Sequence, residues 1–571
     1  MEYLEPQAAE LADVPDAEAR PVERIAPLIG VSALALGLAA CDSGGGNSGG
    51  GGIVTPVPTP TPTPTAAVIT KTQASRFLSQ STMGATNVAI ADVQARGYDG
   101  WITAQFGTAR ATSHWDWLVA KGYNVAANIN SETGFDNTMW RQMILEPDQL
   151  RQRVGMALLE VMVVGIGGVN LNWKQFAMAA YVDVLLDNAF GNFRTILDKI
   201  TTNAAMGSFL TFLGNRKANT TTGSVPDENY ARELMQLFTL GVHRLNMDGS
   251  VQTSAGLPLE TYVPADVSGL ARVFTGLNVD SSDGTTPDRL RRPLIVTASQ
   301  HETGASSFLG ASVPAGTAGM DAVRIALDTI FAHPNVPPFV SKQLILKLVT
   351  SNPSAAYVGR VSAVFANNGA GVRGDMQAVI RAVLMDSEAR AEPLGNRSGK
   401  LREPVMRLTG WARAFGALSA SDLWAFGDTN SSTNRLAQSM GRSGSVFNFF
   451  RPGYSPPNTA IADGGLIAPE FQITNEPSVV AYVNYMQSVI SNTIGDIRAD
   501  YGPLLAVVTD AAALVALVNE TVAGGQLSAA TVTTIATAVS SITAGTTAGN
   551  NNRVYTAVLL TMASPEYLTL K

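Results

Sequence analysis

The sequence predicts a mostly α-helical protein: a large multi-helix body with long loops, preceded by a signal peptide and a flexible tether. Hydrophobic residues make up 46% of the 571 residues and charged residues 15%, which is enough apolar material for a large core. From Lys71 onward apolar residues recur with a helical period, and no sustained alternation indicates strands. We therefore expect a signal peptide at 1–40, a tether at 41–70, a helical body at 71–500 and its C-terminal helical part at 501–571.

The N-terminal segment has the features of an export signal. Residues 25–40 form an apolar run too short for a transmembrane helix, which needs about 20 residues. The run ends in Leu38-Ala39-Ala40-Cys41, which resembles the lipobox of bacterial lipoproteins and implies cleavage before Cys41 and lipidation of it. Residues 1–24 depart from a usual signal because they carry seven acidic residues and two arginines. We expect a lipid-anchored protein of the cell envelope, on the periplasmic or outer-membrane face, attached to the membrane through this lipid.

The tether is recognised by its composition. Residues 44–52 are nearly all glycine, and residues 55–65 are a Thr-Pro repeat. Glycine-rich chain is flexible, whereas alternating proline favours extended polyproline II. The two stretches together would hold a folded body away from a membrane.

Within the body, the clearest helix is expected at residues 227–240. Ser224 is the expected cap, and Gly241 is placed to end the helix. Tyr230, Leu234 and the other apolar residues share one face. The same periodicity predicts further helices at 148–164, 340–349, 376–385, 402–415 and 479–490, with long loops at 280–288 and 430–445.

Composition excludes several function classes. A net charge of −7 argues against a nucleic-acid binder, which usually carries a basic excess. The single cysteine and four scattered histidines argue against a disulfide and a metal site, so no metal is expected. Zinc-helix, phosphate-loop and usable nucleophile-elbow motifs are absent, and the sequence identifies no cofactor.

The polar face of the 227–240 helix holds the first candidate site. Glu228 and Arg232 are four residues apart, as are Asn229 and Glu233, so each pair lies on one side of the helix. In a cleft, Glu233 is a candidate base, and Glu228, Asn229 and Arg232 are candidate binding residues. The alternative is an ion-pair face that joins helices. We expect this face to be buried against another helix.

Histidines give two further catalytic candidates. His301 precedes Glu302 in a turn-rich segment, and His333 precedes a proline at the start of a helix. Imidazole suits proton transfer near neutral pH, but both residues also fit a role in holding loops or turns. Five tryptophans in the first third of the chain fit either a sugar-binding groove or a hydrophobic core. They are Trp101, Trp115, Trp117, Trp140 and Trp173.

Several stretches, in order, resemble the bacterial domain-of-unknown-function family 1800. They are Asp227–Leu234 with Phe238–Gly241, Asp266–Gly276, His301–Gly304 with Phe308–Gly310, His333-Pro334 with Lys342–Leu344, Lys400–Pro404, Phe449–Gly453 and Ala563–Tyr567. Leu277, Glu302 and Ser306 stand where the family usually has other residues. The resemblance implies an exported, largely helical protein without a settled activity. It also implies a partner, a co-encoded exported protein with a sulfatase-like fold.

Two functions remain open from the sequence. The first is a binding or assembly protein of the envelope that works with another exported protein. The second is an envelope hydrolase with a site centred on Arg232 and Glu233 that uses His301 or His333. Convergence of these groups in one cavity would favour the hydrolase.

Overall fold

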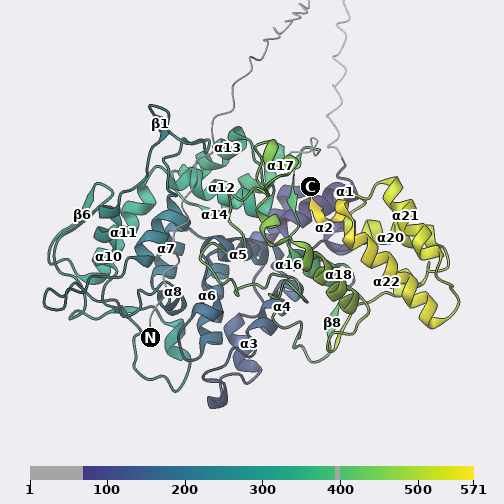
Figure 1. Cartoon of the computed structure of the whole chain (residues 1–571), viewed down its shortest axis with the longest axis horizontal. Coiled ribbons are helices and arrows are strands. Elements are labelled where there is room, and N and C mark those ends of the chain that lie inside the picture. The colour runs from purple at the N-terminus through teal and green to yellow at the C-terminus, as the bar shows by residue number, and fades with distance from the viewer. Residues whose placement is uncertain (1–67, 393–398) are drawn as a thin grey trace, which may run out of the picture. The chain divides into compact units, whose positions relative to one another are not determined.

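The structure, a computed structural model, describes residues 68–392 and 399–571. The predictions about the signal peptide, Cys41 and most of the tether fall on residues 1–67 and lie outside the described part. The described residues form twenty-three α-helices and ten strands of two or three residues, so the mostly α-helical class is confirmed (Figure 1). None of the described helices is long and apolar enough to cross a membrane.

The first half of the body contains eleven helices. They are α1 (Lys71–Ser81), α2 (Asn87–Gly107), α3 (His114–Ala120), α4 (Phe135–Leu145), α5 (Gln149–Val161), α6 (Lys174–Asn188), α7 (Phe193–Thr201), α8 (Ala204–Phe209), α9 (Asn229–Glu233), α10 (Pro264–Val273) and α11 (Gly319–Ala332). A π-helical turn at Leu234–Thr239 continues α9.

The second half contains twelve. They are α12 (Val336–Leu348), α13 (Ala355–Ala366), α14 (Met376–Met385), α15 (Ser387–Arg390), α16 (Pro404–Ala414), α17 (Ala460–Asp463), α18 (Glu476–Ile490), α19 (Gly502–Leu505), α20 (Ala511–Ala523), α21 (Ala529–Ser540), α22 (Thr547–Ala563) and α23 (Pro565–Leu568). A 3₁₀ turn at Pro469–Ile473 lies between α17 and α18.

The strands form five antiparallel pairs. They are β1 (Thr253–Ser254) with β2 (Leu257–Pro258), β3 (Leu277–Asn278) with β4 (Ile295–Val296), β5 (Ser306–Phe308) with β6 (Ala311–Val313), β8 (Leu418–Ser419) with β9 (Ile497–Arg498), and β10 (Thr569–Leu570) with β7 (Lys400–Leu401). In the last pair Leu570 faces Lys400, so the end of the chain returns to a segment 170 positions earlier.

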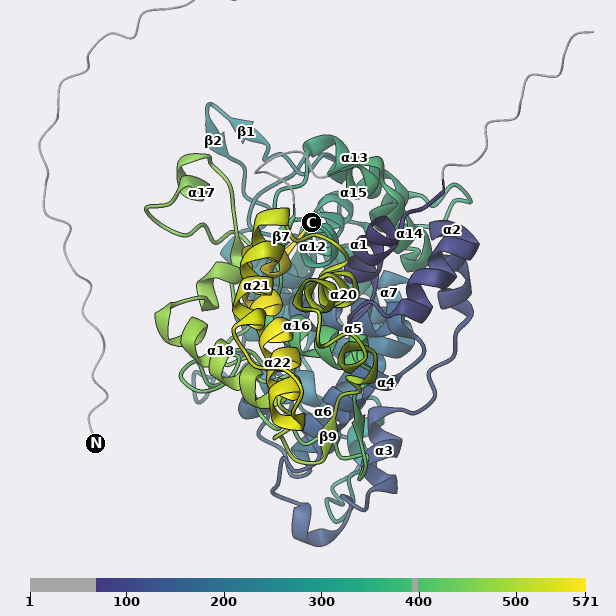
Figure 2. The ribbon, with the colours of Figure 1, turned by 90° about the vertical axis from the view of Figure 1, so that its right-hand side faces the viewer.

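The core is built around α5 and α6. Helix α6 packs against α3, α5, α7 and α8, and eleven of its fifteen residues are buried. Helices α20, α21 and α22 pack on one another, and α22 also packs on α18 (Figure 2). The five tryptophans of the first third are all at most 5% exposed. They therefore belong to the core and do not line a sugar-binding groove.

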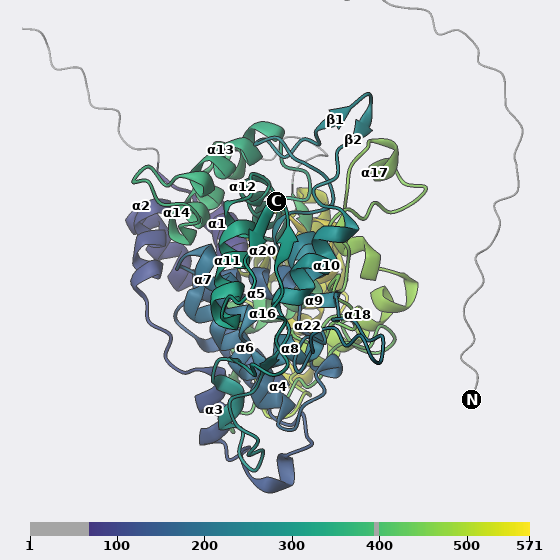
Figure 3. The same cartoon turned by 90° about the vertical axis from the view of Figure 1, so that its left-hand side faces the viewer.

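Residues 242–263, which we call the arm, project from the body with β1 and β2 at the tip (Figure 3). Backbone bridges between His243 and Glu260 and between Leu245 and Val251 hold its two sides together. At the tip Ala255 and Gly256 have φ of 50° and 81°. Two successive positive φ values give the tight turn whose twist matches that of a two-stranded hairpin.

Most predicted helices are confirmed, with shifted ends. Helix α14 has the predicted bounds, and α5, α12, α16 and α18 overlap their predicted ranges. The predicted start of the 227–240 helix was wrong. Ser224 pairs with Asn219 in a backbone bridge, and the Asp227 carboxylate accepts the Asn229 N–H at 2.8 Å, so α9 begins only at Asn229. Gly241 ends this helical segment with φ of 74°, as predicted.

Candidate functional site

Glu228 and Arg232 form an exposed ion pair. The Arg232 guanidinium lies 3.1 Å from the Glu228 carboxylate, and the two side chains are 43% and 37% exposed. Ser268 on α10 donates a hydrogen bond to the other Glu228 oxygen. The expectation that Arg232 is buried was therefore wrong. Helix α10 packs against α9 beside the ion pair, but it leaves the charged ends of Arg232 and Glu228 exposed to solvent.

Glu233 has a different environment from Arg232. Its residue is only 7% exposed, and its Oε2 has no hydrogen-bond partner within the described residues. Burial raises the pKa of this carboxyl, and the charge of Arg232 opposes the shift. No hydrogen bond joins Glu233 to Asn229 in the described part of the chain, so the predicted second pair does not form there. Glu233 is a buried carboxyl without a strong partner.

His301 is held by the backbone that follows α10. It is 4% exposed, and its Nδ1 lies 2.9 Å from the carbonyl oxygen of Thr275, so Nδ1 carries the proton and donates. The neighbouring Glu302 lies 3.6 Å from Arg272. The N–H of Gly304 and the charge of Arg272 lower the pKa of Glu302, although partial burial opposes them. His301 therefore anchors a loop next to a surface ion pair.

His333 ends α11 and shapes the turn into α12. Its Nδ1 accepts the Asn335 N–H at 3.1 Å, and its carbonyl accepts a bond from Arg373. Burial, followed by the charges of Arg244 and Arg373, lowers the pKa of His333. This geometry fits the turn role that was one of the two interpretations of the sequence. Among the described residues, no hydrogen bond joins any two of Glu233, His301 and His333.

A cluster of six charged side chains, which we call the ion cluster, lies in the core where no site was predicted. Each of the six residues is at most 5% exposed, and they come from α5, α12, β7, the start of α16 and the 3₁₀ turn before α18. Burying so many charges is expensive unless they are paired. The members are Arg153, Glu160, Lys347, Lys400, Glu403 and Glu470.

Lys400 is the centre of this cluster. Its Nζ lies 2.9 Å from Glu470 and 3.2 Å from Glu403, and it also donates to the carbonyls of Leu346 and Lys347. Burial lowers the pKa of Lys400, but the charges of Glu470 and Glu403 outweigh this effect and raise it. Lys400 is therefore protonated, and its ammonium group contacts two carboxylates and two backbone carbonyls.

The pKa values of two carboxyl groups in the cluster are shifted in opposite directions. Burial and the charge of Glu403 raise the pKa of Glu160 to about 8. Burial opposes ionisation of Glu403 as well, but the charge of Lys400, helped by those of Lys347 and Arg153, holds its pKa far below the usual range. At neutral pH Glu160 is thus protonated and Glu403 ionised. Glu160 also lies 3.2 Å from Lys347, whose ammonium sits 4.4 Å from the centre of the Phe450 ring.

The ion cluster joins family-like stretches that are far apart in the chain. Lys400 and Glu403 belong to the Lys400–Pro404 stretch, and Phe450 belongs to Phe449–Gly453. One signal could have indicated the cluster in advance. Arg153 and Glu160 are seven residues apart in an apolar helix, on the same face as buried Ala157, where charged residues are rarely buried without partners.

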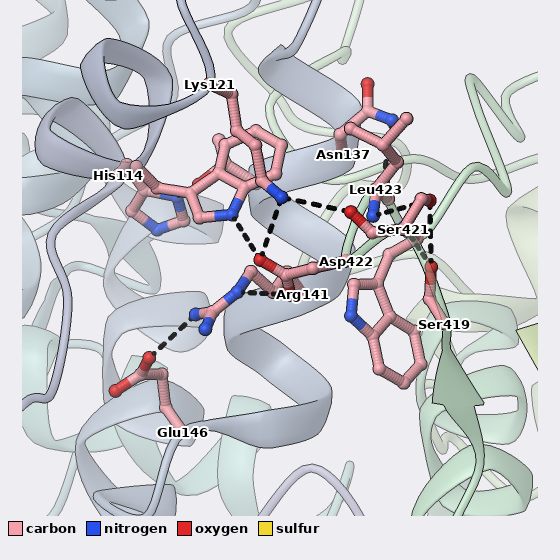
Figure 4. Close-up of polar contacts among 12 residues, drawn as sticks. His114, Lys121, Asn137, Arg141, Glu146, Ser419, Ser421, Asp422 and Leu423 are labelled. Carbon is pink, nitrogen blue, oxygen red and sulfur yellow. Dashed lines mark hydrogen bonds and ion pairs between the residues drawn. The ribbon is translucent and has the colours of Figure 1, made fainter.

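A second network fixes the loop before α17 to the first helices (Figure 4). Asp422 accepts bonds from Arg141 at 2.8 Å and from the Trp117 indole N–H at 3.1 Å, and it lies 3.3 Å from Lys121. Partial burial would raise the pKa of Asp422, but the bonds from Trp117 and Arg141 lower it. Arg141 also pairs with buried Glu146 at 3.0 Å. The network explains how Asp422 keeps a φ of 59°, which non-glycine residues rarely adopt.

The described residues contain no group of three or more His, Cys, Asp and Glu side chains that could hold a metal ion. No curated protein and no solved structure was found to match this chain. A family model described as "Protein of unknown function (DUF1800)" matches residues 76–569, which is most of the chain, and the chain therefore belongs to that family.

Proposed function

We propose that this protein is a lipid-anchored cell-envelope protein, on the periplasmic or outer-membrane face, that works by binding another exported protein. The lipobox-like Leu38–Cys41 and the Gly and Thr-Pro stretches that follow support an anchor with a long reach. The proposed partner is the co-encoded exported protein with a sulfatase-like fold that the family resemblance implies.

The apolar surface of the arm is the observation that carries the proposal. Of the nineteen large hydrophobic residues that are exposed in the described part of the chain, five fall within residues 242–263. Soluble monomers rarely gather exposed apolar side chains on a projecting element unless the element binds something. The five residues are Val242, Met247, Val251, Leu257 and Val263.

The placement of the candidate catalytic groups also supports binding. Glu233, His301 and His333 each contact a different set of residues, so no two of them are arranged for proton transfer. One observation favours the second candidate function, an envelope hydrolase. Glu233 is buried with a raised pKa and an unpartnered oxygen, which suits a general acid.

Co-purification of the tagged partner tests the binding proposal. Leu257→Asp on the arm should lower recovery of the partner with the membrane-anchored protein at least tenfold. The control is Leu418→Asp, because Leu418 is similarly exposed, at 65% against 71% for Leu257, but lies on β8. Equal recovery with both variants, or no recovery with the unmodified protein, would contradict the proposal. Hydrolysis of phosphate, sulfate or ester substrates that Glu233→Gln abolishes would favour the hydrolase instead.

A further inference from the structure

A cavity of about 830 Å³ is lined by residues of α1, α12, α13 and α15 and of the loops that follow them. Its volume is within the range typical of small-molecule sites, roughly 300–1,000 Å³. None of the residues discussed as catalytic candidates lines it. The cavity is thus separate from the candidate catalytic groups, and at Lys342 it borders the arm, since a Cβ on Gly249 would lie 3.6 Å from the Lys342 Cδ.

One part of the cavity wall is apolar. It consists of Val349 and Pro353 after α12, Ala356 on α13, and Leu466 and Ile467 before the 3₁₀ turn. These side chains come from three separate segments, so their apolar surfaces meet only in the folded protein. Covering such a surface with an apolar ligand stabilises a complex by about 25 cal/mol for each Å² removed from water.

Two cations line the same cavity without an acidic partner. Arg76 on α1 and Lys342 on α12 have no carboxylate within 4.0 Å in the described part of the chain. Arg76 donates one bond to the carbonyl of Ala391, and its Nε has no hydrogen-bond partner among the described residues. Burial lowers the pKa of Arg76, and the charge of Glu392 opposes this shift. Half-buried cations of this kind gain more from an anion than exposed ones do.

Four other charged residues line the cavity: Arg360, Glu388, Glu392 and Lys571. Arg360 is paired with Asp386 through two contacts of 2.7 and 2.9 Å. Glu388 accepts bonds from the backbone N–H and the hydroxyl of Ser354. Arg360 and Glu388 therefore already have direct partners. Glu392 acts on Arg76 through its charge, but neither Arg76 nor Lys342 forms an ion pair within 4.0 Å in the described part of the chain.

We infer that this cavity binds a single anionic amphiphile, a molecule with an apolar chain and a carboxylate or phosphate head. The chain covers the wall formed by Val349, Pro353 and Leu466, and the head pairs with Lys342 and Arg76. Fatty acids and alkyl phosphates share this chemistry. The inference is independent of the proposed partner, because it rests on none of the arm residues.

Calorimetric titration tests the inference with three probes below their micelle concentrations: decanoate, decyl phosphate and neutral decanol. The full chain carries Cys41→Ala, so that no acyl group of its own competes. We expect saturable one-to-one binding of at least one anionic probe and binding at least tenfold weaker for decanol and for acetate or inorganic phosphate alone. If decanoate binds more tightly, the ligand is a fatty acid; if decyl phosphate binds more tightly, it is an alkyl phosphate.

Charge reversal locates the binding. Lys342→Glu should weaken binding of the anionic probe at least tenfold, whereas Lys217→Glu, which changes an exposed lysine away from the cavity, should not. Lys342→Gln is the milder variant if Lys342→Glu lowers the melting temperature. Absence of saturable binding, equal binding of decanol and decanoate, or equal affinity of the Lys342 and Lys217 variants would each overturn the inference.

Discussion

The raised pKa of Glu160 in the ion cluster makes a quantitative prediction about the pH dependence of stability. Glu160 is protonated in the folded protein up to a pKa of about 8, whereas an unfolded glutamic acid loses its proton near 4.3. Between these values the folded state therefore binds more protons than the unfolded state at this residue. Stability must fall as the pH rises through this window, by about 1.4 kcal/mol for each pH unit while Glu160 stays protonated.

Replacing the titrating group should remove this slope. Glu160→Gln keeps the shape of the side chain, but it cannot ionise. From pH 6 to pH 8 the unmodified protein should lose about 2–3 kcal/mol of unfolding free energy relative to the variant. The paired Glu403 does not contribute in this window, because its lowered pKa places its own loss of stability at acid pH. Other groups titrate equally in both proteins, so the difference between the two curves isolates Glu160.

Urea unfolding at pH 6, 7, 8 and 9 measures the effect. Glu520→Gln is the control, because Glu520 is 46% exposed in a surface pair with Lys71 and should give a curve parallel to that of the unmodified protein. Glu403→Gln should instead destabilise at every pH by about 3–5 kcal/mol, because it leaves buried Lys400 underpaired. A constant difference between Glu160→Gln and the unmodified protein from pH 6 to pH 9 would refute the raised pKa of Glu160.

Four further predictions follow from the structure and the sequence. Cys41→Ala should move the protein from the membrane fraction to the soluble fraction or leave it uncleaved, and unchanged processing and fractionation would argue against lipidation. Deleting Gly44–Thr65 should shift the melting temperature of the body by no more than a few degrees in calorimetry; a large drop would mean that this stretch packs on the body. Arg232→Ala should change the unfolding free energy by less than about 1 kcal/mol in urea, since its ion pair is exposed, and a loss of several kcal/mol would contradict that. Gly165→Ala should destabilise by about 1–3 kcal/mol in the same assay, because a Cβ there would lie 2.0 Å from the Ser443 carbonyl oxygen; an unchanged midpoint would show that the two backbones separate easily.

Helices with an apolar stripe could be predicted from the sequence, because their periodicity is a local property. This explains why α14 was placed correctly and α12, α16 and α18 nearly so. The start of α9 could not be predicted in the same way. It depends on Ser224 pairing with Asn219 and on the Asp227 side chain capping Asn229, a choice between two competing local hydrogen-bond patterns.

The candidate sites could be predicted only in part, because their environment depends on contacts between elements that are far apart in the sequence. The polar face of α9 was recognised, but its exposure depends on where α10 crosses it, and the sequence does not give that crossing. The ion cluster was missed because its members lie up to about three hundred positions apart, and each resembles an ordinary surface charge when read alone. Glu160 and Lys347 become buried partners only when α5 and α12 are brought together by the fold.

The pairing of β10 with β7 has a consequence for how the chain matures. Arg402 donates its backbone N–H to Leu568 and its guanidinium N–H to Tyr567, and Leu570 pairs with Lys400. The segment that carries Lys400 and Glu403 therefore lacks its strand partner until synthesis has reached Thr569 and Leu570. Such late closure of a long-range contact slows the final folding step. For the export that we propose, this delay is an advantage, because a chain whose core closes late stays unfolded while it crosses a translocation channel.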